Sequence, residues 1–91
     1  MPETKAPDRP RLAPGVRLHF DQTRQAWVLL GPERVIEIEG PASDILQRCD
    51  GTRSLVQIVD DLAALYTADR AEIEGDVRDM LTELVDKRMV V

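Results

Sequence analysis

The sequence predicts an α+β domain in which a three-stranded antiparallel β-meander precedes a three-helix bundle. Up to residue 39, short runs alternate apolar and polar side chains with a period of two, as strands with one buried face do. From residue 41 onward, apolar residues recur every three or four positions, which is the period of an amphipathic helix. Gly40 and Pro41 mark the change, so we expect the order β-β-β-α-α-α.

Three short strands are expected near residues 16–20, 26–30 and 35–39. In the third run, Ile36 and Ile38 share one face and two glutamates share the other. Polar or Gly-Pro connections separate the runs, and connections this short join antiparallel neighbours.

Three helices are expected near residues 41–50, 54–66 and 69–88. Ser54 followed by Gln57 is the signature of a capping box at the start of the second helix. An acidic pair with the same spacing, Asp69 and Glu72, opens the third helix. The apolar stripe of the third helix comprises Ile73, Val77, Met80, Leu81, Leu84 and Val85.

Residues 1–15 are predicted to form a Pro-rich N-terminal arm, and residues 16–91 a single domain. Prolines fix φ and lack a backbone donor, so neither a helix nor an inner strand suits the arm. A flexible tail and an arm that docks on another surface both fit this composition. The helix–turn–helix rhythm of residues 41–65, with three strands before it as a wing, makes the predicted fold winged-helix-like.

Charge and cysteine content limit the possible partners. The chain has a net charge of −5, and no cluster of Lys or Arg follows residue 20, so we expect no nucleic-acid partner. The single cysteine, Cys49, excludes an internal disulfide and a multi-cysteine zinc site, and it fits a reducing cytoplasm. No apolar run approaches the roughly 20 residues that cross a bilayer, and no export signal is visible. We therefore expect a cytoplasmic protein without a membrane partner.

No group of residues indicates catalysis. His19 falls on the polar face of a strand, where a solvated imidazole is expected, and Cys49 falls on an apolar helix stripe, where a small core residue is expected. The acids of the third helix are spaced like a solvated face, and the glycines are too scattered to form a phosphate loop. The sequence therefore predicts a protein that is not an enzyme, without catalytic, cofactor-binding or metal-binding residues.

The third strand is a candidate binding edge. If the meander is sequential, residues 35–39 lie at the edge of the sheet, and they contain neither proline nor lysine to block pairing. The strand leads directly into the helices, so a helix can wall one side of it. Such an edge can accept an added strand. An edge covered by the arm or by a second subunit is an equal alternative.

Several motifs along the chain resemble those of one family. Residues 9–18 read RPRLAPGVRL, residues 29–33 read LLGPE, and residues 49–55 read CDGTRSL. Together with Asp76, Val77, Leu81 and Leu84 near the end, they resemble the pyrroloquinoline quinone (PQQ) biosynthesis protein D family, PqqD, over residues 9–91. One stretch departs: where the family often reads ELNxTA, residues 37–42 read EIEGPA, without the Asn cap.

The resemblance implies a peptide chaperone of the kind called a RiPP recognition element. Such a protein binds the ribosomal precursor peptide PqqA and presents it to the radical SAM enzyme PqqE. In this class, the peptide adds as a strand to the third strand and packs against the third helix. The implied peptide-binding residues are Val35, Ile36, Glu37, Ile38, Glu39, Ile73, Val77 and Leu81.

Two other classes of protein fit the sequence less well. A winged-helix DNA-binding regulator needs a basic recognition helix, but residues 70–88 carry four basic residues against six acids. A carrier protein with a phosphopantetheine arm needs an Asp-Ser-Leu helix start, and Asp50 and Ser54 are too far apart for it. A monomer and a homodimer, formed through edges or exchanged arms, both remain open.

Overall fold

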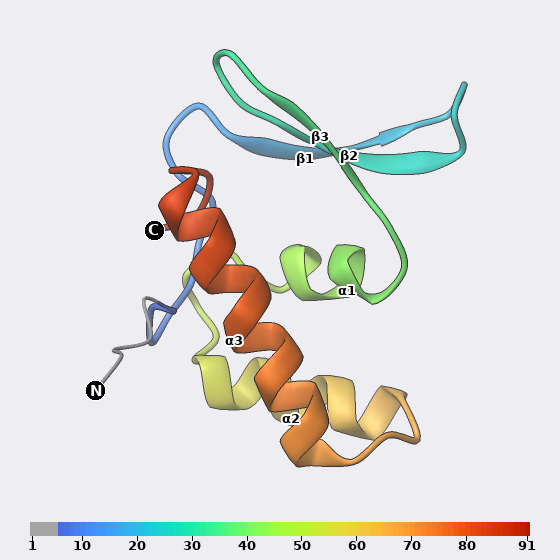
Figure 1. Ribbon diagram of the computed structural model, residues 1–91, viewed down its shortest axis with the longest axis vertical. Coiled ribbons are helices and arrows are strands. Elements are labelled where there is room, and N and C mark those ends of the chain that lie inside the picture. Colours follow the sequence, from blue (N-terminus) through green and yellow to red (C-terminus); the bar gives the residue numbers. More distant parts are fainter. Residues whose placement is uncertain (1–5) are drawn as a thin grey trace.

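The structure is a computed structural model that describes residues 6–91 (Figure 1). Its elements are β1 (Arg17–Asp21), β2 (Ala26–Leu30), β3 (Val35–Ile38), α1 (Pro41–Gln47), α2 (Leu55–Leu65) and α3 (Arg70–Asp86). The predicted α+β class and element order are confirmed. The largest boundary difference is at α1, which ends three residues before residue 50. There the Arg48 N–H bonds to the Ile45 carbonyl, and the chain leaves the helix to pair Asp50 with Arg11.

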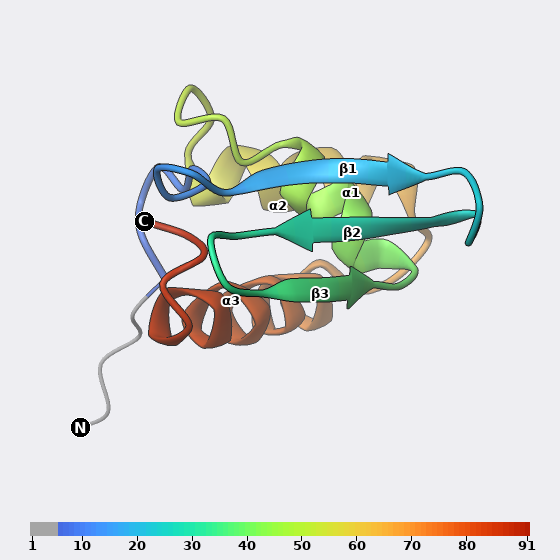
Figure 2. The ribbon, with the colours of Figure 1, turned by 90° about the horizontal axis from the view of Figure 1, so that it is seen from above.

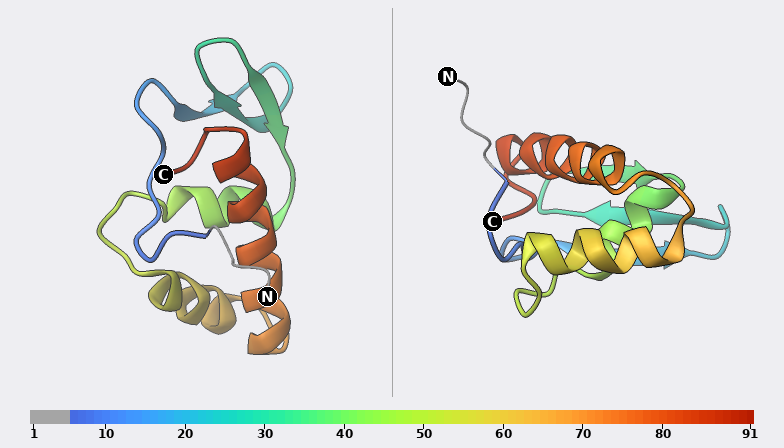
Figure 3. Two further views of the ribbon diagram at one scale, coloured as in Figure 1. Left: turned by 60° about the vertical axis from the view of Figure 1, so that its left-hand side comes forward. Right: turned by 90° about the horizontal axis from the view of Figure 1, so that it is seen from below.

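The sheet is a sequential antiparallel meander in the order β1-β2-β3, so β1 and β3 are both edge strands. Trp27 pairs with Phe20 on one side and with Ile38 on the other. The sheet forms one layer and the helices a second. β3 lies on the side of the sheet nearest α3 (Figure 2), and the opposite view agrees (Figure 3).

The hydrophobic core fills the space between the sheet and the helices. Because the chain has only three aromatic residues, aliphatic side chains dominate this core. Leu29, Ile58, Val77 and Leu81 are fully buried within it. The full cluster comprises Leu29, Ile38, Ile45, Leu46, Cys49, Leu55, Ile58, Val59, Leu62, Ile73, Val77, Leu81, Leu84, Met89 and Val90.

Side-chain caps fix the starts of the two longer helices. At α2 the predicted capping box is confirmed: the Gln57 N–H donates to Ser54 Oγ at 3.1 Å, and the Ser54 N–H donates to Gln57 Oε1 at 2.8 Å. At α3 the carboxylate of Asp69 accepts a hydrogen bond from the Ala71 N–H at 3.2 Å. Each cap satisfies a backbone donor that has no partner within its helix.

Part of the predicted N-terminal arm is hydrogen-bonded to the domain. The Leu55 N–H donates to the Asp8 carbonyl at 2.7 Å, and the Gly51 N–H donates to the Pro10 carbonyl at 3.1 Å. Arg11 exchanges two backbone hydrogen bonds with Val91. Such hydrogen bonds join residues 8–13 to the rest of the domain, and the division into an arm over residues 1–15 and a domain over residues 16–91 stays a prediction. The first five residues of the arm lie outside the described residues.

Candidate functional site

The hydrogen-bonding pattern of the β2–β3 hairpin determines which backbone groups face its free edge. The Gly31 N–H donates to the Arg34 carbonyl at 2.9 Å, so these opposite residues form a hydrogen-bonded pair. Hydrogen-bonded and non-bonded pairs alternate along antiparallel strands. Ile36 and Ile38 therefore direct their N–H and C=O groups toward β2. The same groups of Val35 and Glu37 point away from the sheet.

The side chains of this strand follow the same alternation. Val35, Glu37 and Glu39 are exposed, Ile36 is half-buried, and Ile38 is buried in the core. Val35 is 66% exposed, which is unusual for a valine in a strand. An apolar side chain and outward backbone groups thus lie together on an edge that pairs with no other strand among residues 6–91.

The site residues predicted on α3 lie deeper than those on β3. Ile73, Val77 and Leu81 are all buried. Ile73 and Val77 line a pocket beside the helix, whereas Leu81 lines neither pocket described below and is 0% exposed. A ligand on this face can therefore reach Ile73 and Val77 without opening the core, but not Leu81.

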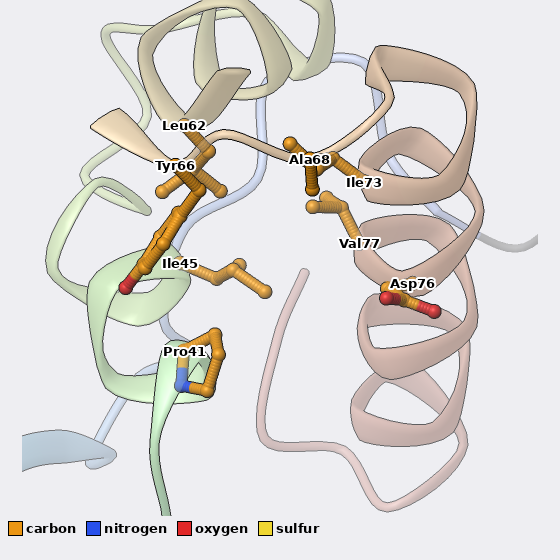
Figure 4. A pocket seen from close by; sticks show the side chains of 8 residues that line it. All are labelled: Pro41, Ile45, Leu62, Tyr66, Ala68, Ile73, Asp76 and Val77. Atoms are coloured by element: carbon orange, nitrogen blue, oxygen red, sulfur yellow. The ribbon is translucent and has the colours of Figure 1, made fainter. Parts of the chain in front are cut away.

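An apolar pocket of about 180 Å³ lies between α1 and α3, near the end of β3. Figure 4 shows Pro41 and Ile45 on one side of it and Asp76 and Val77 on the opposite side. We call this the apolar pocket; it is lined by Pro41, Ile45, Leu62, Tyr66, Ala68, Ile73, Asp76 and Val77. The Tyr66 hydroxyl donates to the Asp44 carboxylate, and this hydrogen bond, together with partial burial, raises the pKa of Tyr66.

A second hollow of about 360 Å³ lies at the opposite end of β3. We call it the cationic pocket; it is lined by Pro14, Val16, Pro32, Glu33, Arg34, Lys87, Arg88 and Met89. Its lining residues include those of the β2–β3 turn and of the segment that follows α3. Sequence reasoning missed this pocket and six of the eight residues that line the apolar pocket, because each pocket draws residues from segments that are far apart in the chain.

The single histidine and the single cysteine of the chain lie in different environments. His19 is exposed on β1, and Cys49 is buried, both as predicted. Burial, reinforced by the charge of Asp50, raises the pKa of Cys49 to about 12, so its thiol is protonated at neutral pH. Within residues 6–91, no three His, Cys, Asp or Glu side chains are grouped so that they could hold a metal ion.

The CDGTRS motif builds a turn rather than a reactive site. The Asp50 carboxylate accepts hydrogen bonds from the Thr52 hydroxyl at 2.6 Å and the Thr52 N–H at 2.9 Å, and these bonds lower the pKa of Asp50. The Thr52 carbonyl accepts a hydrogen bond from Arg9, and Ser54 caps α2. The motif therefore holds the N-terminal segment against the start of α2.

The arginines of α3 are engaged in ion pairs with neighbouring acids. Arg70 contacts Asp60 at 2.8 Å and Glu74 at 3.2 Å, and Arg78 contacts Glu74 at 3.0 Å. The hydrogen bond from Arg78 is the main cause that lowers the pKa of Glu74. This acid-rich face is unsuited to the phosphate backbone of DNA. Among residues 6–91, no helix combines the length and apolarity needed to span a bilayer.

The fold and the site define a small α+β domain with an open sheet edge beside a helix, an arrangement to which an extended segment can add. The chain belongs to the PqqD family: the family model described as coenzyme PQQ synthesis protein D matches residues 26–90. The resemblance seen in the sequence motifs is thereby confirmed.

Similar proteins support this assignment in sequence. A "PqqA binding protein" from Rhodopseudomonas palustris strain HaA2 is 56% identical over 79 residues, which cover 87% of this chain and 78% of the relative. A "PqqA binding protein" from Xanthomonas oryzae pv. oryzae strain KACC10331 is 51% identical over 82 residues, which cover 90% and 89% of the two chains.

Solved structures of the family agree with the fold. The solution structure of the PqqD truncation of Methylobacterium extorquens PqqCD has a TM-score of 0.82 at 40% identity, over 98% of this chain and 95% of that one. It is described as a functional, stand-alone RiPP recognition element. The crystal structure of PqqD from Xanthomonas campestris has a TM-score of 0.59 at 52% identity, over 85% and 86% of the two chains.

Proposed function

We propose that this chain is a non-catalytic, cytoplasmic peptide chaperone of PQQ biosynthesis, which binds the precursor peptide PqqA and presents it to the radical SAM enzyme PqqE. Membership of the PqqD family and the names of the relatives support the choice of peptide. The open edge of β3 supports the mode of binding. Presentation to PqqE rests on the family resemblance, and it implies that bound peptide stays reachable from outside the domain.

The single observation that carries this proposal is the outward direction of the Val35 and Glu37 backbone groups. Each residue offers one N–H and one C=O, so an added strand can form up to four hydrogen bonds. Each bond contributes roughly 0.5–1.5 kcal/mol. Apolar side chains of the peptide add roughly 1.5–3 kcal/mol each on burial. Ordering a flexible peptide costs several kcal/mol in return.

This balance corresponds to an affinity on the order of micromolar, which suits a carrier that must release its cargo. A monomer is the binding form that we propose. A homodimer that paired two β3 edges would occupy the groups that the peptide needs, so peptide and dimer would compete.

Amide chemical-shift mapping with synthetic PqqA tests the proposal. We expect the largest shift changes along β3, at Val35 to Glu39, and on α3 around Ile73 and Val77. A scrambled peptide of the same composition is the control, and it should cause much smaller changes. Changes confined to residues 6–15, or equal changes with both peptides, would place binding elsewhere and contradict the proposal.

A further inference from the structure

The two ends of β3 differ in chemistry. Arg34, which lines the cationic pocket, immediately precedes the strand, and Pro41, which lines the apolar pocket, follows it after two intervening residues. The strand between them has four residues. At about 3.3 Å per residue, a peptide paired along it would span roughly 13 Å before reaching either pocket.

The apolar pocket has the size of one side chain. A protein cavity of about 150 Å³ is large enough to bind benzene, and this pocket measures about 180 Å³. Its lining is almost entirely apolar, and the Tyr66 hydroxyl is already engaged with Asp44. Asp76, which also lines the pocket, would repel a carboxylate. An aromatic or branched aliphatic side chain therefore fits this pocket, and an acidic one does not.

The cationic pocket has the opposite preference. Arg34, Lys87 and Arg88 outnumber its one acid, Glu33, in a chain whose net charge is −5. Lys87 is paired with Glu83 at 3.0 Å. Among the ion pairs of residues 6–91, none involves Arg34 or Arg88. Two guanidinium groups are thus free to form bidentate hydrogen bonds with a carboxylate.

We propose that β3 binds a peptide through two side-chain anchors: an apolar side chain in the apolar pocket and a carboxylate in the cationic pocket, at least four residues apart. The inference rests on the proposed function and names the feature of PqqA that is selected. Backbone pairing along β3 is indifferent to sequence, because it uses only N–H and C=O groups. The two pockets supply the discrimination that this pairing lacks.

Filling the apolar pocket tests the first anchor. Ala68 lines the pocket from an exposed loop, so Ala68→Phe occupies its volume without altering β3. Ala64→Phe is the matched control, because Ala64 is exposed on α2 and lines neither pocket. Calorimetric titration with synthetic PqqA should show at least tenfold weaker binding for Ala68→Phe and less than a twofold change for the control. Circular dichroism checks that both variants are folded.

Reversing charge tests the second anchor. The double variant Arg34→Glu with Arg88→Glu should also bind PqqA at least tenfold more weakly. Arg17→Glu, on the exposed face of β1, is the control and should change affinity less than twofold. A panel of PqqA peptides, each with one acid replaced by Lys, should contain one peptide that restores binding to the double variant. A purely structural role for the arginines would give no such rescue.

The outcomes separate this inference from the proposed function. If the pocket variants bind like the parent while a proline in the β3 edge weakens binding, strand addition stands and the two-anchor inference is wrong. Loss at only one pocket, or no rescue by any Lys peptide, also overturns it. If the parent protein does not bind PqqA, the proposed function itself fails.

Discussion

The hydrogen bond from the Gly31 N–H to the Arg34 carbonyl, at 2.9 Å, determines which residue pairs of the β2–β3 hairpin are hydrogen-bonded. It thereby determines which backbone groups of β3 face the free edge. Because hydrogen-bonded and non-bonded pairs alternate along the hairpin, the backbone N–H and C=O groups of Ile36 and Ile38 point toward β2. Those of Glu37 point away from the sheet, where an incoming strand can bond to them. One substitution at position 37 can therefore alter the edge while leaving the sheet intact.

Glu37→Pro should bind PqqA roughly two- to tenfold more weakly than Glu37→Ala. Proline removes the outward N–H, and with it one hydrogen bond to the peptide, whereas alanine keeps that donor. Both variants lose the exposed ion pair with Arg24, at 3.8 Å, so this effect cancels in the comparison. Titration calorimetry on the two folded variants gives the ratio. Equal affinities would mean that the peptide does not pair with this edge.

Ile36→Pro is predicted to act differently, through stability. Its N–H points toward β2, so proline at this position removes a hydrogen bond between β2 and β3. We expect a lower melting temperature for Ile36→Pro than for Glu37→Pro, measured by circular dichroism. A lower melting temperature for Glu37→Pro would show that the N–H directions assigned to these two residues are wrong.

Ile58→Ala should lower the free energy of unfolding by roughly 2–5 kcal/mol. The Ile58 side chain is 0% exposed and lies in the core between α2 and its neighbours, so truncation leaves a cavity. Val56→Ala is the control on the same helix: Val56 is 55% exposed, and its loss should change stability by less than about 0.5 kcal/mol. Urea unfolding of both variants tests this, and similar values would contradict the assigned burial of α2.

Two glycines should respond to alanine in opposite directions. Gly75 lies within α3 with nothing within 4 Å of an added Cβ, so Gly75→Ala should stabilise the protein by roughly 0.5–1 kcal/mol. Gly51 has φ +84°, and Gly51→Ala should destabilise the protein by roughly 1–2 kcal/mol because that conformation strains a residue with a Cβ. Thermal unfolding distinguishes the two, and a gain at Gly51 would contradict the described turn.

Sequence periodicity was sufficient for the elements but not for the pockets. The alternation around Ile36 and Ile38, and the Ser54–Gln57 cap, are local signals that place a strand and a helix start without tertiary information. The edge status of β3 followed from the short connections between strands. The direction of the Glu37 N–H did not, because it depends on which residues of the hairpin turn are hydrogen-bonded.

The cationic pocket shows why the sequence alone does not predict the pockets. Arg34 and Arg88 are far apart in sequence and meet only because the β2–β3 turn lies over the end of α3. The two segments lie close together at Gly31, where an added Cβ would be 3.0 Å from the sulfur of Met89 and would require that side chain to shift. The contact of residues 8–13 with the domain likewise depends on the tertiary structure. Prolines predict that a segment lacks regular structure, but not which surface the segment packs on.

The last prediction concerns Cys49 and alkaline pH. Burial raises the thiol pKa from 9.0 to about 12 in the folded protein, so folding favours the protonated form. A raised pKa contributes stability that is fully present below pH 9 and is lost as pH rises from there toward 12. The free-energy advantage of the parent over Cys49→Ala should therefore shrink between pH 9 and 11, by at most about 1.4 kcal/mol per pH unit. Urea unfolding of both proteins across this range measures it, and other titrating groups cancel in the difference. A constant difference across the range would mean that the Cys49 thiol is exposed to solvent in the folded protein.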